Sequence, residues 1–222
     1  MRLTVLSTTA AAALLVVSCT GDPEGGTLDP PGDGAASPKE AVDQLVGFLN
    51  IPDFQAASDL AYPGQAALAS LAEGATFGEV ASALDEGDRV VAANFWSGFA
   101  QGTGSFLIGA VTTTEAGVET QQGVEFHRVT VVPPSGEGRV MLTRESGGHR
   151  IDLFASFGGG LAARMIAPVE RLLGTQTEDS GIILAALRDL VPSLIIAAGQ
   201  EDLSPEASQD LTRLIELITR PG

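Results

Sequence analysis

The chain has few of the residue types from which catalytic and metal sites are built. Its 222 residues include one cysteine, Cys19, and two histidines, His127 and His149. A zinc site uses three or four Cys, His or carboxylate ligands, and the sequence has no HxxxH or CxxC spacing. It also has no GxSxG turn for a nucleophilic serine. We therefore expect no metal, no cofactor and no enzymatic activity, and we interpret both histidines as surface residues of strands.

Positive charge is also scarce, with 12 basic residues against 28 acidic ones and a single lysine, Lys39. Nucleic-acid phosphates repel such a surface, so no nucleic-acid partner is expected. Anionic lipid headgroups repel it as well, so attachment to a membrane requires an anchor. The preference for arginine, with abundant Ala, Gly and Val, indicates the G+C-rich coding typical of actinobacteria.

The N-terminus supplies a candidate anchor. Arg2 and the apolar stretch from Leu3 to Val17 have the layout of an export signal and are too short for a good membrane span. The signal ends in Val16-Val17-Ser18-Cys19, which resembles the lipobox of bacterial lipoproteins. The resemblance implies diacylglycerol on the Cys19 thiol and cleavage between Ser18 and Cys19. It places the protein at the extracytoplasmic face of the cell membrane, held by lipid, and it accounts for the lone cysteine.

Three segments follow from this interpretation. Residues 1–18 are the signal peptide, and residues 19–37 are the lipidated cysteine with an acidic Gly/Pro tether that is too polar to bury a core. Residues 38–222 have the length of a single globular domain, in which 38–157 hold helices plus a sheet and 158–222 hold C-terminal helices.

The expected fold class is α+β. Ser37, Pro38 and Glu40 form a helix start that opens a series of short helices, and residues 89–99 suit either a helix or a strand. Four strands with Gly-rich turns then predict an antiparallel meander. Three C-terminal helices follow it, with Gly158-Gly159-Gly160 as a hinge. The predicted strands are Phe106–Thr114, Gly123–Val132, Arg139–Arg144 and His149–Ser156, and the predicted helices are Leu161–Leu173, Gly181–Ala198 and one starting at Ser204.

Two other features were weighed against functional alternatives. The apolar run at 182–198 holds Arg188, Asp189 and Pro192, and we interpret it as a buried helix rather than a membrane span. Gly158-Gly159-Gly160 lacks a following lysine and does not form a phosphate loop. In element order, helices that close over an antiparallel sheet, the chain resembles the nuclear transport factor 2 fold. That resemblance implies a pocket above the sheet, and the C-terminal helices depart from it.

Pairing of the predicted strands gives the only candidate ligand residues. Centring the hairpins on Gly136 and on Gly147-Gly148 places Glu145 opposite both His127 and Arg150. The same register places Arg128 opposite Arg144 at the end of an apolar face. Cross-strand charge pairs are the ordinary interpretation of these rows. The functional alternative is that Arg128 and Arg144 bind an anionic headgroup.

Three classes of function remain open at this point. The first is a non-catalytic binding module for a lipid or another apolar or amphipathic small molecule, held between sheet and helices. The second is an envelope scaffold or adaptor that binds a protein partner through an exposed apolar patch. The third, an enzyme, requires one of the two histidines in a cleft beside a carboxylate.

Overall fold

The computed structural model describes residues 34–86 and 89–220. The predicted signal peptide, Cys19 and the tether up to residue 33 lie outside the described residues.

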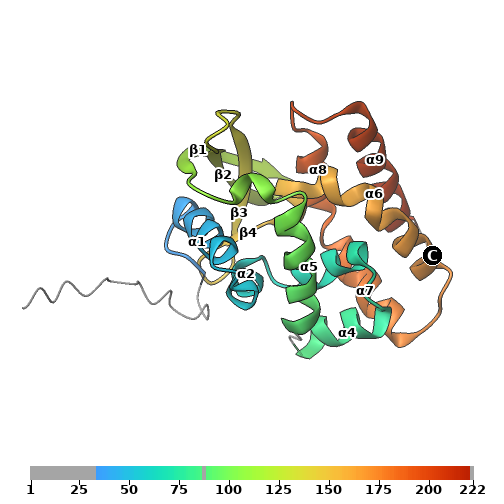
Figure 1. The fold of residues 1–222 in the computed structure, drawn as a ribbon. Coiled ribbons are helices and arrows are strands. Elements are labelled where there is room, and N and C mark those ends of the chain that lie inside the picture. The colour runs from blue at the N-terminus through green and yellow to red at the C-terminus, as the bar shows by residue number, and fades with distance from the viewer. Residues whose placement is uncertain (1–33, 87–88, 221–222) are drawn as a thin grey trace, which may run out of the picture.

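The fold class predicted from the sequence, α+β, is confirmed (Figure 1). A group of N-terminal helices precedes an antiparallel meander, and C-terminal helices follow it. The N-terminal helices are α1 (Pro38–Asn50), α2 (Phe54–Leu60), α3 (Gln65–Ala69), η1 (Ser70–Glu73), α4 (Phe77–Glu86), α5 (Arg89–Gln101) and η2 (Ser105–Leu107). The strands are β1 (Thr112–Gln121), β2 (Val124–Val132), β3 (Arg139–Glu145) and β4 (His149–Ile151), and the C-terminal helices are α6 (Leu153–Leu173), α7 (Glu178–Arg188), α8 (Val191–Ala198) and α9 (Pro205–Thr219).

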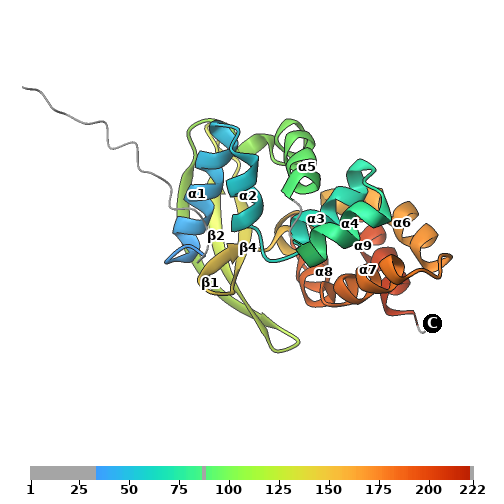
Figure 2. The same ribbon diagram turned by 90° about the horizontal axis from the view of Figure 1, so that it is seen from below.

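The sheet, ordered β1-β2-β3-β4, is covered on both faces (Figure 2). One face carries Val129, Met141 and Ile151 and packs against α1. The other face carries Phe126 and Leu142, which pack against Ala155 of α6 and Ile196 of α8. Side chains alternate between the two faces along each strand, so both faces of β2 and β3 contribute to the interior.

The buried core runs without a break from α1 to α9. The question left open for residues 89–99 is resolved in favour of a helix, α5. The aromatic side chains on one face of α5 are buried. Trp96 packs edge-on against Phe95 and Phe99, with ring centroids 5.1 Å apart in each pair. The Trp96 indole N–H donates to the Ser58 hydroxyl at 2.9 Å, so the largest core side chain also has its polar atom satisfied.

The chain enters the domain along the edge of β4. Ser37 caps α1 as predicted, since its hydroxyl accepts from the Glu40 amide at 3.1 Å. Just before that cap, Ala35 and His149 exchange backbone hydrogen bonds of 3.0 and 2.8 Å. Gly34 and Gly148 lie so close that a Cβ on Gly148 would sit 2.5 Å from the Gly34 carbonyl oxygen. Residues 34–36 are therefore part of the sheet edge.

Three predicted strand boundaries are wrong, and one of them is the end of the first strand, which continues to Gln121 instead of ending at Thr114. The apolar run at Phe106 begins as the 3₁₀ turn η2, and β1 starts only at Thr112, after Gly109 has turned the chain with φ +97°. The last strand ends at Ile151 rather than at residue 156, because the Asp152 carboxylate accepts from the Ala155 amide at 2.8 Å and starts α6. A strong N-cap outweighs the strand-like pattern of the residues after it.

The predicted glycine hinge is also wrong, because Gly158, Gly159 and Gly160 lie inside α6. Their missing side chains allow close contacts on three sides of the helix. A Cβ on Gly158 would lie 2.9 Å from the Ala197 Cβ, and one on Gly159 would lie 2.5 Å from a methyl of Leu203. The triplet therefore brings α8 and the connection to α9 against α6.

The predicted helix over 181–198 is divided into α7 and α8, which meet at an angle of 48°. Thr177 and Ser180 form a capping box that starts α7 earlier, and Pro192 lies in the first turn of α8. Within the described residues no single helix is long and apolar enough to cross a membrane, although this bent pair passes on length and composition. Its apolar side chains Ile183, Leu187 and Leu194 are fully buried.

The predicted strand register is wrong in both hairpins. The turn after β3 has three residues, 146–148, so Glu145 faces His149 instead of Arg150. That shift of one residue moves Arg150 onto the face that carries Arg144. In the other hairpin Arg128 faces Leu142, two residues from its predicted partner. A shift of two keeps the face, so Arg128 and Arg144 do share one face of the sheet.

The glycine contacts predict opposite effects for two alanine substitutions. Gly158→Ala places a methyl against Ala197 and Leu211, and we expect it to lower the free energy of unfolding by about 2 kcal/mol despite the better helix propensity of alanine. Gly181→Ala, in α7 with no atom within 4 Å of the added Cβ, should raise it by about 0.5–1 kcal/mol. Urea unfolding followed by circular dichroism measures both. Stabilisation of the Gly158 variant would show that the seam is loosely packed.

Candidate functional site

Two adjoining concavities lie at the seam between the sheet and the C-terminal helices, with volumes of about 530 and 480 Å³. We call them together the seam groove. Both are lined by Gly138, Arg139, Val140, Gln200 and Asp202. The first extends to Phe106, Phe157, Gly159, Gly160 and Leu203, and the second to Glu119, Arg128, Leu142, Ile196 and Glu201.

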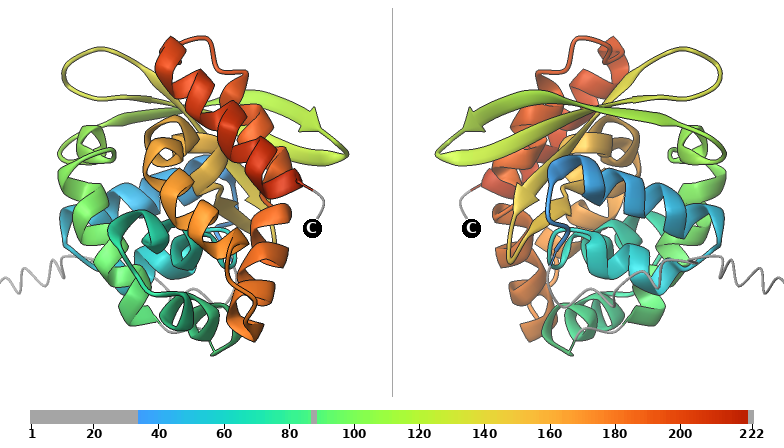
Figure 3. Two further views of the ribbon diagram at one scale, coloured as in Figure 1. Left: turned by 90° about the vertical axis from the view of Figure 1, so that its right-hand side faces the viewer. Right: turned by 90° about the vertical axis from the view of Figure 1, so that its left-hand side faces the viewer.

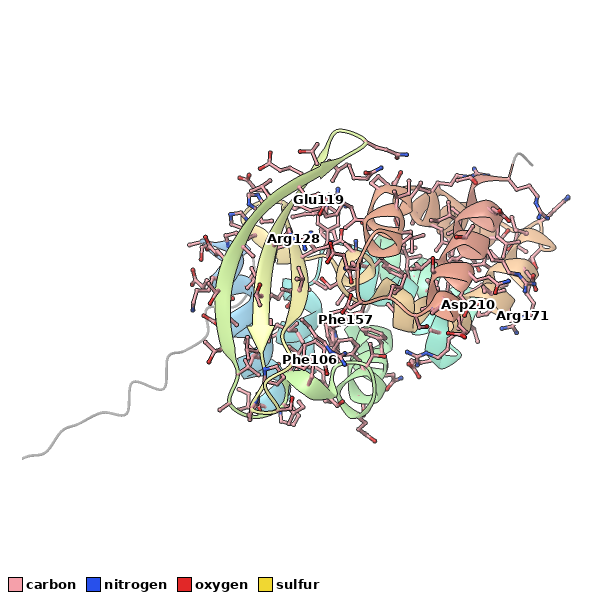
Figure 4. All side chains as sticks on the ribbon, turned by 90° about the horizontal axis from the view of Figure 1, so that it is seen from above. Phe106, Glu119, Arg128, Phe157, Arg171 and Asp210 are labelled. Atoms are coloured by element: carbon pink, nitrogen blue, oxygen red, sulfur yellow. The ribbon has the colours of Figure 1, made fainter. Side chains whose placement is uncertain are left out.

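Figure 4 looks onto this seam. Glu119 and Arg128 mark its sheet side, and Phe106 and Phe157 mark its other end. The remaining labelled residues, Arg171 and Asp210, lie away from the groove on the C-terminal helices. Figure 3 shows the C-terminal helices beside the sheet, and α8 contacts β1, so the groove is built from segments far apart in sequence.

Aromatic rings form the base of one end. The guanidinium carbon of Arg139 lies 4.7 Å from the centroid of the Phe106 ring. Phe106 contacts Phe157 at 6.1 Å between centroids, and Phe157 packs edge-on against Phe99 at 4.8 Å. Because Phe157 is only 5% exposed, this stack is part of the core. Arg139 is thus held over the groove by a cation–π contact on a rigid base.

The wall formed by α6 contains backbone and small side chains. Gly159 and Gly160 line it, and the Gln200 amide donates to the Ala155 carbonyl at 2.7 Å. That hydrogen bond holds the start of the α8–α9 connection against α6. The groove is therefore bounded by elements held in place rather than by a free loop.

Charges in the groove are of two kinds. Arg128 forms an ion pair with Glu119 at 2.7 Å. Arg139 and the acids Glu137, Glu201 and Asp202 line the groove, and none of them belongs to an ion pair within the described part of the chain. These groups are therefore available to a ligand.

Arg144, the second predicted ligand residue, has a structural role. It lines a separate cavity of about 500 Å³ near Tyr62 and the α7–α8 bend. Its guanidinium stacks on the Tyr62 ring at 3.9 Å, donates to the Tyr62 hydroxyl at 3.1 Å and pairs with Asp152 at 3.4 Å. Arg128 and Arg144 thus share a face but line different cavities, and they do not form one site.

Asp152 is the buried partner of Arg144. Its side chain has no exposed surface and also accepts from the Ser193 hydroxyl at 2.7 Å. Burial raises the pKa of the Asp152 carboxyl, and the hydrogen bonds from Ser193 and Ala155 with the charge of Arg144 oppose that rise. Beside it the side-chain Oε1 of Gln65 accepts from the Leu153 backbone amide at 2.6 Å. This cluster joins α3, β3, α6 and α8.

The two histidines contact each other on the sheet face that carries α1. His127 and His149 stack edge-on with centroids 4.8 Å apart, and His127 lies 3.3 Å from a carboxylate oxygen of Glu125. Neither lines the seam groove. Over residues 34–86 and 89–220, no group of three or more His, Cys, Asp or Glu side chains is arranged to hold a metal ion.

A further concavity, of about 880 Å³, lies between α6 and α9 and is lined largely by charged and polar residues. Glu170 and Arg213 form an ion pair across it at 2.6 Å, and only Leu173 and Leu217 give it apolar surface. Both this concavity and the seam groove contain charges that form no ion pair within the described residues, but only the lining of the seam groove includes aromatic rings, so the seam groove is the better candidate for a ligand site.

The main residues of this groove were not predicted from the sequence. Phe106 was assigned to a strand, and Arg139 is one of eleven arginines with no local feature that marks it. The contact between them joins positions 33 residues apart and depends on the true path of η2. The one usable signal was the glycine triplet, because glycines inside a helix allow close backbone approach.

The Asp152 cluster predicts a large loss of stability on truncation. Asp152→Ala removes the α6 cap and leaves Arg144 and Ser193 without their buried acceptor, so the free energy of unfolding should fall by about 3–5 kcal/mol. Ser204→Ala, which removes the exposed cap of α9, should cost only about 1 kcal/mol. Thermal and urea unfolding compare the two. Equal losses would show that the buried network adds nothing beyond capping.

The histidine pair predicts a pH dependence. Burial and the nearby His127 lower the pKa of His149, while Glu145 and Glu115 oppose the shift. The folded protein therefore resists protonation of His149. Neutral His149 makes its full contribution to the free energy of unfolding at pH values above the unfolded pKa, near 6.5. That contribution is lost as the pH falls through the lower pKa of His149 in the folded protein. Unfolding measured between pH 7.5 and 5 should show this decline, and His149→Gln should reduce it. His127→Gln should weaken the decline too, and an unchanged slope in both variants would contradict this origin.

Comparisons with known proteins do not assign a function to the site. No family model, no curated protein and no solved structure matches this chain. The resemblance in element order to nuclear transport factor 2 therefore stays a prediction. Any assignment of function has to be argued from the geometry of the seam groove.

Proposed function

We propose that this protein is a lipid-anchored, extracytoplasmic binding module whose seam groove holds an amphipathic ligand of the cell envelope. The lipobox-like Val16-Val17-Ser18-Cys19 motif supports attachment through Cys19. The single observation that carries the ligand-binding role is the groove itself, an aromatic and aliphatic base beside Arg139, Glu137, Glu201 and Asp202, which form no ion pair within the described residues.

The ligand site lies at the rim of the sheet–helix interface rather than inside it. The centre of that interface is filled by Phe126, Leu142, Ala155 and Ile196, each at most 5% exposed. An internal pocket over the sheet would need these side chains to withdraw from one another. The seam groove needs no such rearrangement, because Val140 and Phe106 are already only partly buried there.

A second candidate function, a scaffold that binds an envelope protein, is supported by β1. This ten-residue strand lies at the edge of the sheet, and most of its side chains are exposed, including Val118 at 54%. Within the described residues no strand pairs with its outer edge. Such an edge accepts an added strand from a partner. The groove is more specific in shape and chemistry, so the ligand-binding function is preferred.

Native mass spectrometry of a blocked groove tests the proposal. Val140→Trp fills the stretch common to both concavities, and Val118→Trp places the same bulk on the opposite face of the sheet as a matched control. The chain from residue 20 onward should carry extra mass that denaturation releases as an amphiphile. We expect Val140→Trp to reduce that occupancy about tenfold, a change of about 1.4 kcal/mol in binding. The control should retain it.

Two results would contradict the proposal. One is a mass without any adduct in the unmodified chain. The other is equal occupancy in the Val140 and Val118 variants, with circular dichroism showing that both are folded. Crosslinking in the envelope would then test the scaffold function, with β1 as the expected contact.

A further inference from the structure

The charges of the seam groove do not suit a ligand of one sign. After the Arg128–Glu119 ion pair is set aside, the lining holds one arginine, Arg139, and three carboxylates. A plain anion would meet those carboxylates, in a chain whose formal net charge is −16. A plain cation would meet the guanidinium of Arg139. A ligand that carries both charges satisfies both groups.

The unlike charges line one groove without neutralising each other. Arg139 and Asp202 both belong to the part common to the two concavities, yet they are not within ion-pairing distance. Arg139 is kept in place by the Phe106 ring. A group that carries an anion for Arg139 and a cation for Asp202 can therefore contact both residues in the same groove.

The cationic end is better matched by a primary ammonium than by a quaternary one. Carboxylates accept charge-assisted hydrogen bonds from N–H donors, and Glu137, Glu201 and Asp202 offer several acceptors. A quaternary ammonium has no N–H and is usually bound on aromatic faces. The ring nearest the charges, Phe106, already holds Arg139.

Apolar surface continues from these charges along the groove. The partly exposed apolar side chains are Phe106 and Leu203 toward α6 and Val140 on the sheet, and the buried Phe157, Leu142 and Ile196 close the groove behind them. Acyl chains beside a polar headgroup would therefore meet aliphatic and aromatic side chains on either side of Arg139.

Resting on the proposed function, we infer that the ligand has a zwitterionic aminophospholipid-type headgroup, with its phosphate on Arg139 and its ammonium on the carboxylates around Asp202. The headgroup lies over the part common to both concavities, and the acyl chains follow the apolar lining.

Competition between defined lipids tests this inference. The full-length protein in maltoside micelles receives equal amounts of dioleoyl phosphatidylethanolamine, phosphatidylcholine and phosphatidylglycerol, and native mass spectrometry resolves which is bound. We expect bound phosphatidylethanolamine to exceed each of the other two lipids about fivefold, the size of one exposed charge-assisted contact.

Arg139→Gln should reduce binding of all three phospholipids. Asp202→Asn should remove the preference for ethanolamine over glycerol. Arg171→Gln and Asp210→Asn, the matched charges away from the groove in Figure 4, should leave the pattern unchanged.

The possible results distinguish a failure of the headgroup assignment from a failure of the proposed ligand-binding function. Equal binding of the three lipids, unchanged by Arg139→Gln and Asp202→Asn but lowered by Val140→Trp, would overturn the headgroup assignment and leave the groove as the ligand site. Binding that Val140→Trp does not lower would overturn the proposed function itself. Loss of the ethanolamine preference in Asp202→Asn with a normal unfolding transition supports the inference.

Discussion

The buried carboxylate of Asp152 is the point at which the layers of this protein meet. It ends β4 and caps α6, and it accepts from Ser193 of α8. Through Arg144 it also reaches β3 and, across the guanidinium, the Tyr62 ring. A charge taken out of water is costly unless its partners are all present, so the carboxylate is favourable only when the helices and the sheet are in their native places. The cluster thus specifies how the C-terminal helices sit on the sheet.

The same placement of helices creates the seam groove. Asp152 sets where α6 starts, and about two turns later the glycine triplet lets α8 and the α8–α9 connection approach the helix backbone. Side chains at those positions would hold the connection away from α6. Because glycine has none, the wall of the groove is backbone, and the α8–α9 connection that carries Gln200 and Asp202 comes to lie opposite Arg139. The groove is therefore a consequence of close helix packing at a site where the sheet ends.

Local signals predicted the elements of this fold better than their connections. Ser37, Thr177 and Ser204 cap helices by the chemistry of their side chains, which needs only neighbouring residues, although the cap at Thr177 was not recognised. The register of β3 on β4 depended on whether the turn holds two or three residues, and the glycines at 147 and 148 suit both. Asp152 was interpreted as a strand residue because the atoms that stabilise it, from Ser193 and Arg144, come from other elements.

The candidate site was harder to predict from the sequence than the fold was. The reason lies in how the arginines of this protein are paired, which also bears on the chemistry of the site. In the described part of the chain four arginines, Arg128, Arg144, Arg164 and Arg213, each pair with a carboxylate. In so acidic a protein an exposed guanidinium has many carboxylates within reach of its flexible side chain, and an ion pair on the surface costs little to form. Arg139 lies on an aromatic ring instead, with acids in the same groove that it does not contact. The guanidinium and the carboxylates of the groove are thus not paired with each other, and a ligand that bears both charges can join them.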